Sequence, residues 1–111
     1  MPDTFNNFVD GRWTPSRTGQ TFDNENPAAK GSNLGFFQSS GPDDIDEAIG
    51  AADAAFRTWR SVPVAERQQY VSEFLRLLKT SRDELARIVT LEKGKTIRES
   101  RGEVDSAVVE G

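Results

Sequence analysis

Residues 83–104, DELARIVTLEKGKTIRESRGEV, decide the fold expected for this chain, because they describe one helix that ends and another that begins. Gly94 is placed to adopt the left-handed conformation that stops a helix. Lys93 and Lys95 put positive charge near the negative end of the first helix dipole. The stretch therefore predicts two helices joined by a tight turn at Gly94.

The same capping pattern stands at the start of both helices. Ser81 with Glu84, and Thr96 with Glu99, have the Ser/Thr-x-x-Glu form of a capping box. Apolar residues then recur at helical spacing, namely Leu85, Ile88 and Val89 in the first segment and Val104, Ala107 and Val108 in the second. Gly102 lies inside the second helix, where glycine is about 1 kcal/mol less favourable than alanine. A close backbone contact would be one reason for a glycine there.

Two more amphipathic helices are expected upstream of this stretch. The first opens at 40–42 with acidic residues crowded at its positive end, and its apolar face is Ile45, Ala48, Ile49, Ala52, Ala55, Phe56 and Trp59. The second starts near Pro63, a favourable first-turn residue, and carries Tyr70, Val71, Phe74, Leu75 and Leu78. One-sided helices of this kind need a surface to cover them.

Short strands are expected before the helices. Asp10-Gly11 between apolar positions predicts a hairpin over 7–13. Residues 21–26 form a second extended piece that ends at Pro27, and residues 34–39 form another strand. The chain thus divides into strands and loops at 1–40 and helices at 41–111. The short helices can also bury one another in a small bundle, which is the alternative arrangement.

Composition excludes several functions for these 111 residues. They contain 35% hydrophobic and 29% charged residues with a net charge of −4, and no basic patch suited to nucleic acid is present. The chain has no cysteine and no histidine, so it holds no cysteine nucleophile, no thiolate metal site and no imidazole base. No signal-peptide pattern and no apolar run of about 20 residues is present, so no membrane contact and a cytoplasmic location are expected.

Three candidate binding motifs fail on spacing. Gly94-Lys95-Thr96 matches the end of a phosphate-binding loop, but that motif needs a glycine where Val89 stands. The pair Asp44 and Asp46 resembles the start of a calcium loop, whose next ligand position is occupied by an alanine. The glycines at 31 and 35 are too few for a dinucleotide-binding turn.

The other polar and aromatic residues that stand out are interpreted as structural. Trp13 and Trp59 are expected to anchor a core rather than to bind a ligand. Glu103 is expected to form a structural salt bridge. The pairs Glu66-Arg67 and Glu99-Arg101 are interpreted as solvated faces.

The ordered motifs resemble the N-terminal part of an aldehyde dehydrogenase. They are the hairpin FVDGRW at 8–13, Asn-Pro-Ala at 26–28, Gly35, the helical pattern of Asp44, Ala48, Ala52, Ala55, Phe56 and Trp59, the pair Glu66-Arg67, TLEKGK at 90–95 and Gly-Glu-Val at 102–104. The resemblance covers nearly the whole chain, and its specificity lies in the order and spacing of the motifs. It implies an α/β parent with a Rossmann-type cofactor domain, of which residues 1–111 are the N-terminal part.

The resemblance also implies an activity for the parent. Members of the family oxidise an aldehyde to a carboxylic acid, or to an acyl-CoA thioester in some branches, with NAD or NADP. A cysteine thiolate attacks the aldehyde to give a thiohemiacetal, hydride passes to the nicotinamide, and a glutamate activates water. In the family pattern these groups and the cofactor-binding residues lie downstream of Gly111, so the chain itself is expected to be an inactive scaffold of a homo-oligomeric enzyme.

One metal site is carried over from the resemblance. Some members hold a sodium or potassium ion near the extended piece before Asn-Pro and near the acidic residue before the Lys-Gly-Lys turn. The matching positions here are Asn24 and Glu92, which can both offer oxygen ligands. The alternative for Glu92 is an exposed position in the last turn of its helix.

Two other functions fit the sequence. The chain can be a complete small α+β module that binds a partner protein through its helix faces. It can also be a truncated paralogue that pairs with a full-length enzyme. The substrate aldehyde, the choice between NAD and NADP, and the number of subunits are not determined by these residues.

Overall fold

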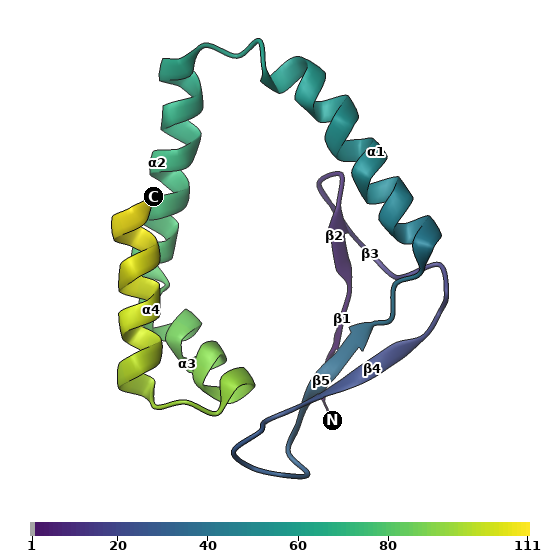
Figure 1. The fold of residues 1–111 in the computed structure, drawn as a ribbon, viewed down its shortest axis with the longest axis vertical. Coiled ribbons are helices and arrows are strands. Elements are labelled where there is room, and N and C mark those ends of the chain that lie inside the picture. Colours follow the sequence, from purple (N-terminus) through teal and green to yellow (C-terminus); the bar gives the residue numbers. More distant parts are fainter. Residues whose placement is uncertain (1) are drawn as a thin grey trace. The chain divides into compact units, whose positions relative to one another are not determined.

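The computed structural model describes residues 2–111, which form two compact units (Figure 1). One unit contains the residues up to Asn24 together with Asn33–Val62, and the other contains Glu25–Ser32 and Pro63–Gly111. Short strands come first and four helices follow. The predicted order of a mixed α/β chain is therefore confirmed.

A three-stranded sheet has the order β1-β5-β4, from Thr4–Phe5, Asn33–Gln38 and Thr21–Glu25 respectively. The last two strands correspond to the predicted extended pieces. Strand β1 was not expected, since it has two residues and pairs in parallel with a strand some thirty positions away, with Thr4 opposite Phe36. Gly35 permits this pairing, because a Cβ atom there would lie 2.5 Å from the Phe5 ring.

The predicted hairpin is formed by β2 (Asn7–Val9) and β3 (Arg12–Thr14), which pair antiparallel. Its turn has positive φ at both central residues, 50° at Asp10 and 73° at Gly11, as the twist of a two-residue hairpin requires. Phe8 and Trp13 face each other with ring centroids 5.0 Å apart. Trp13 is 71% exposed, so the expectation that it anchors a core is wrong for the described residues. Phe8, at 60% exposed, is likewise largely accessible.

Helix α1 (Pro42–Trp59) begins where the sequence predicts. Proline occupies its first position, and the carboxylate of Asp44 accepts a hydrogen bond of 2.9 Å from the Gly41 N–H. None of the residues 42–59 is buried, although their apolar residues have helical spacing. Trp59 remains 41% exposed, so it is not the predicted core anchor either. The apolar face of α1 is therefore correctly placed but uncovered.

Helices α2 (Val64–Thr80) and α3 (Arg82–Lys93) are separated by one residue, Ser81. The capping box predicted for Ser81 and Glu84 does not form, because Ser81 has φ −93° and ψ 12° and makes no side-chain cap. An N-cap residue needs extended backbone. Ser81 is also the C-cap of α2, and its N–H donates to the Leu77 carbonyl at 2.9 Å. Because Ser81 keeps this hydrogen bond, its backbone does not adopt the extended conformation that an N-cap of α3 needs.

The turn between α3 and α4 (Ile97–Glu110) agrees with the prediction in detail. Gly94 is left-handed, with φ 68° and ψ 18°, and its N–H donates to the Thr90 carbonyl. Thr96 is extended and forms the predicted capping box with Glu99, whose N–H donates to the Thr96 hydroxyl at 3.3 Å. A Thr cap of this kind contributes about 1 kcal/mol. The turn thus sets where α4 begins.

The helices α3 and α4 form the best-packed part of the second unit. The buried apolar residues of the described chain are Ala86 on α3 and Val104 on α4, with exposed fractions of 0% and 7%. Ser100 is fully buried beside them, and its hydroxyl lies 2.8 Å from that of Thr90. Small side chains at this interface let the two helices approach closely.

Gly94 and Gly102 have very different surroundings. A Cβ atom on Gly94 would lie 3.0 Å from the Pro27 side chain and 3.1 Å from Ala28, in the loop segment of the same unit. A Cβ atom on Gly102 would meet nothing within 4 Å among the described residues. The close contact proposed for Gly102 is therefore absent from this part of the protein.

We predict opposite effects of alanine at these two glycines. Gly94→Ala is expected to destabilise the second unit by about 1–2 kcal/mol, because an L-residue is strained in the left-handed conformation, and the contact with Pro27 adds to this cost. Gly102→Ala is expected to leave stability unchanged or raise it by up to about 1 kcal/mol. Urea unfolding followed by helical circular dichroism measures both changes, and equal shifts would contradict this account.

Candidate functional site

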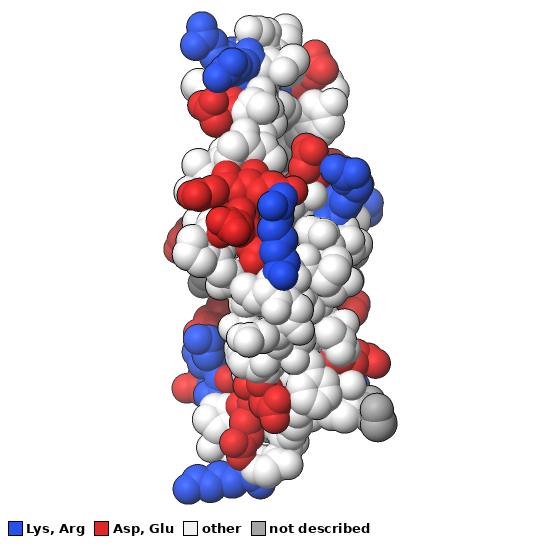
Figure 2. Space-filling view, turned by 90° about the vertical axis from the view of Figure 1, so that its right-hand side faces the viewer, with Lys and Arg blue, Asp and Glu red and all other residues white. Residues whose placement is uncertain are grey.

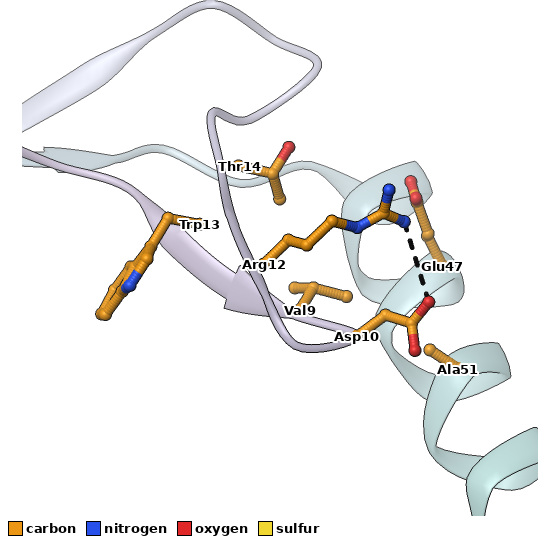
Figure 3. Close-up of a pocket in the computed structure, with 7 residues that line it drawn as sticks. All are labelled: Val9, Asp10, Arg12, Trp13, Thr14, Glu47 and Ala51. Carbon is orange, nitrogen blue, oxygen red and sulfur yellow. Dashed lines mark ion pairs between the residues drawn. The ribbon is translucent and has the colours of Figure 1, made fainter.

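The pocket in Figure 3 lies between the hairpin and α1 in the first unit and has a volume of about 460 Å³. Its lining consists of hairpin residues and one face of α1, namely Val9, Asp10, Arg12, Trp13, Thr14, Glu47 and Ala51. Arg12 and Asp10 extend toward α1, whereas the Trp13 ring points the other way (Figure 3). Arg12 Nη2 lies 3.8 Å from Asp10 Oδ2.

This pocket offers little chemistry. Its charged groups are largely solvated, with 80% of the Arg12 side chain and 67% of the Asp10 side chain exposed. Exposed ion pairs of this geometry contribute little binding or stability. The lining contains no cysteine or histidine, and its hydroxyl, Thr14, has no base paired with it in the lining set. The carboxylates of the lining, Asp10 and Glu47, are paired with Arg12 and Arg17 respectively.

A polar cluster with more hydrogen bonds joins the loop after the hairpin to the first turn of α1. Ser16 is only 5% exposed, and its hydroxyl donates to Asp44 Oδ2 at 2.7 Å. The Arg17 N–H donates to Asp44 Oδ1 at 2.9 Å, and the Gly41 N–H donates to Oδ2. The Ser16 N–H donates to the Gln38 side chain at 2.9 Å. Asp44 thus accepts three hydrogen bonds from two separate segments.

The electrostatics of this cluster favour the ionised carboxylate. The N–H of Arg17, followed by the Ser16 hydroxyl and the Gly41 N–H, lowers the pKa of Asp44 below its ordinary value. The Arg17 guanidinium donates to Glu47 from Nε at 3.0 Å and from Nη2 at 2.6 Å, which raises the pKa of Arg17. Each carboxylate already has donors, so the cluster acts as a structural clamp between loop and helix.

Polar contacts in the second unit are also structural. The Lys95 ammonium pairs with Glu103, which confirms the salt bridge predicted for that glutamate. Arg101 pairs with Asp83 at 2.9 Å and links α4 to α3, while both side chains stay exposed, in agreement with the solvated face expected for this arginine. Figure 2 shows one face of the molecule, on which acidic and basic side chains are mixed among uncharged ones. No expanse of a single sign dominates that view.

The two residues predicted to bind a monovalent cation belong to different units. Asn24 is half-buried in β4, and Glu92 is exposed in the last turn of α3. The cation site stays a prediction. No group of three or more Asp, Glu, His or Cys side chains suited to a metal ion occurs among residues 2–111.

Within the same residues, no helix has the length and apolar character needed to cross a bilayer.

Sequence reasoning missed the role of Ser16 and the half-buried position of Arg67. Ser16 belongs to a polar loop with no periodic pattern, and its partner Asp44 is 28 positions away. A usable signal was the acid at the third helical position after Gly-Pro, which is where a side chain can reach back to the cap. The position of Arg67 had no local signal.

Comparisons with known proteins agree on one family. The profile of the Aldehyde dehydrogenase family matches residues 13–110. The chain is 40% identical over 105 residues to malonate-semialdehyde dehydrogenase 2 of Shouchella clausii, with 95% of this chain and 21% of that relative covered. The match thus extends over nearly all of the described residues.

Solved structures show the same relation. A crystal structure of an NAD-dependent aldehyde dehydrogenase from Sinorhizobium meliloti superimposes with a TM-score of 0.88 and 31% identity, covering 94% of this chain and 21% of that one. A structure of an NADP-dependent enzyme of E. coli has a TM-score of 0.88 and 34% identity, covering 94% and 22%. The chain therefore spans about a fifth of the length of the relatives it matches.

We predict that the clamp at Asp44 makes stability depend on pH. Because the folded-state pKa of Asp44 is lowered, the stability it provides is fully present above its unfolded value, near 3.8, and is lost as pH falls through the lower folded value. Asp44→Asn is expected to destabilise the first unit at pH 7, with a smaller difference from wild type in strong acid. Urea midpoints measured between neutral and acid pH test this expectation.

Asp46→Asn is the matched control, since Asp46 lies exposed near the start of the same helix. Its removal changes the charge near the helix dipole without removing the clamp. If both variants lost stability equally at every pH, the clamp would not be the cause.

Proposed function

The chain belongs to the aldehyde dehydrogenase family, and we propose that residues 1–111 are the N-terminal part of the cofactor-binding domain of a longer NAD(P)-dependent enzyme. The longer enzyme would oxidise an aldehyde to a carboxylic acid. The observation that carries this proposal is the match of 95% of this chain to 21% of a curated dehydrogenase. A match with such unequal coverage is expected when a segment corresponds to one part of a larger fold.

The exposed surface supports a segment that is covered by more protein. The accessible surface is 8559 Å², whereas a compact 12.3 kDa monomer exposes about 6,100 Å². Two separate compact units of half that mass would together expose only about 7,300 Å². Large apolar side chains account for part of the excess, since Ile49 is 63% exposed and Phe74 is 59% exposed.

The glycine turns of residues 2–111 do not have the form of a dinucleotide-binding turn. A dinucleotide-binding turn joins a strand to a helix N-terminus through closely spaced glycines. Gly31, with φ 82°, instead lies in a turn between strands β4 and β5, and Gly94 ends a helix. NAD or NADP would accept hydride in the longer enzyme. The contribution of this chain is the scaffold on which the rest of that domain packs.

The catalytic groups implied by the family are likewise outside this chain. The sequence contains no cysteine, so the thiolate that forms a thiohemiacetal with the aldehyde must come from another segment. Malonate semialdehyde is the first substrate to test, because several curated relatives are named for it. A cytoplasmic, homo-oligomeric enzyme with a monovalent cation at Asn24 and Glu92 completes the proposal by analogy with the family.

We predict that the native protein is several times heavier than the 12.3 kDa of this chain. An antibody raised against residues 1–111 and intact-mass analysis of the captured protein measure this directly. The purified longer protein should reduce NAD or NADP when given an aldehyde, and the 111-residue chain alone should not.

Two results would contradict the proposal. A native species of 12.3 kDa would favour the small interaction module or the truncated paralogue. Turnover of an aldehyde by the isolated chain would show that catalysis does not need the missing groups.

Light scattering of the longer protein tests the homo-oligomer, and its thermal stability in sodium, potassium and a large organic cation tests the ion site.

A further inference from the structure

The side chain of Gln38 joins two parts of the first unit that are far apart in the sequence. Its amide nitrogen donates to the Phe5 carbonyl at 3.1 Å and to Asn6 Oδ1 at 3.2 Å. Its amide oxygen accepts the Ser16 N–H at 2.9 Å. Gln38 is the last residue of β5, so one half-buried side chain contacts both the end of β1 and the loop after the hairpin.

The contact with the loop continues into the clamp at the start of α1. The Ser16 hydroxyl donates to Asp44 Oδ2 at 2.7 Å, and Ser16 is only 5% exposed, so water has little access to this group. Asp44 also accepts the Gly41 N–H. A continuous series of hydrogen bonds therefore runs from the Phe5 carbonyl through Gln38 and Ser16 to the clamp. Linked hydrogen bonds strengthen one another when they are partly buried.

Strand β1 is short and partly exposed. It has two residues, which pair in parallel with Phe36 and Phe37 of β5. Just before it, the Asp3 carbonyl accepts the Phe36 N–H at 2.9 Å. The Phe5 ring stacks on Phe37 with centroids 4.9 Å apart and is 44% exposed. Segments with little burial open locally at low free-energy cost. A side-chain hydrogen bond to the Phe5 carbonyl is therefore a sizeable part of what holds β1 in place.

Other contacts hold the segments that flank β1 and the loop. The Thr18 hydroxyl donates to the Ser39 carbonyl at 2.7 Å. The Asn7 side chain donates to the Ser40 hydroxyl at 2.7 Å. Neither contact passes through Gln38. Loss of the Gln38 amide is therefore expected to act locally on β1, without separating the loop or the hairpin from the end of β5.

We propose that Gln38 couples the docking of β1 to the Asp44 clamp, so that loosening the clamp also releases β1 from β5. The clamp fixes Ser16, the Ser16 N–H orients the Gln38 amide, and the oriented amide holds the Phe5 carbonyl. Release of β1 would leave backbone groups of β5 unpaired along one edge. Gln38 is thus a positioning residue for the N-terminal strand, whatever reaction the longer enzyme carries out.

Hydrogen exchange of the intact protein that contains residues 1–111 tests the coupling. The Phe36 N–H reports on β1, because its acceptor is the Asp3 carbonyl. The Arg17 N–H reports on the clamp, because its acceptor is Asp44. We expect Asp44→Asn to speed exchange at both amides by at least about threefold. Asp46→Asn leaves the clamp intact, and this matched control should change neither amide.

The substitution Gln38→Glu separates the two sides of this side chain. Glutamate keeps an oxygen for the Ser16 N–H but has no N–H to donate to the Phe5 carbonyl. We expect it to speed exchange at Phe36 by at least about threefold and to leave the clamp amide within about 1.5-fold of wild type. In the double variant with Asp44→Asn, Phe36 should exchange at most about 1.5-fold faster than in Gln38→Glu alone, because the coupling is already broken.

Three results would overturn the proposal. Unchanged exchange at Phe36 in Asp44→Asn, with faster exchange at Arg17, would show that β1 is independent of the clamp. Effects of Gln38→Glu and Asp44→Asn that simply multiply in the double variant would show the same. A rise of equal size at residues 51–59 of α1 would mean that the whole unit opens and that β1 is not released selectively.

Discussion

The left-handed turn at Gly94 is the constraint on which the second unit depends. It ends α3, places Thr96 to cap α4, and turns the two helices so that Ala86 and Val104 become buried between them. The same glycine leaves room for Pro27 and Ala28, so the loop segment also depends on the absence of a side chain there. Helix direction, capping and loop packing are thus coupled at one residue.

The first unit is held by polar contacts more than by apolar burial. Its best-defined interaction is the carboxylate of Asp44, which joins the loop at Ser16 to the start of α1. No residue of α1 is buried, and the aromatic pair of Phe8 and Trp13 is largely exposed. Hydrogen bonds of this kind set the geometry, but burial of apolar surface supplies most of the free energy of folding. The unit therefore has well-specified local structure and little core of its own.

The exposed apolar residues also bear on the family match. Its periodic apolar residues match one part of a larger fold, and their exposure marks the surfaces on which more protein would pack. Polar groups that are satisfied, such as Asp44 and Glu103, hold the segment together. The buried Nε of Arg67 has no hydrogen-bond partner among residues 2–111.

The sequence by itself determined the helices, the hairpin and the turn at Gly94, because each depends on residues within a few positions of one another. Capping at Thr96 and the left-handed glycine are local chemistry of this kind. The tertiary structure alone decided strand β1 and the Ser16–Asp44 clamp, because both depend on residues far apart in the chain. It also decided the conformation of Ser81, which ends α2 and precedes α3, so that its side chain does not cap α3. Local patterns specify backbone conformation, whereas burial and pairing depend on what the folded chain brings together.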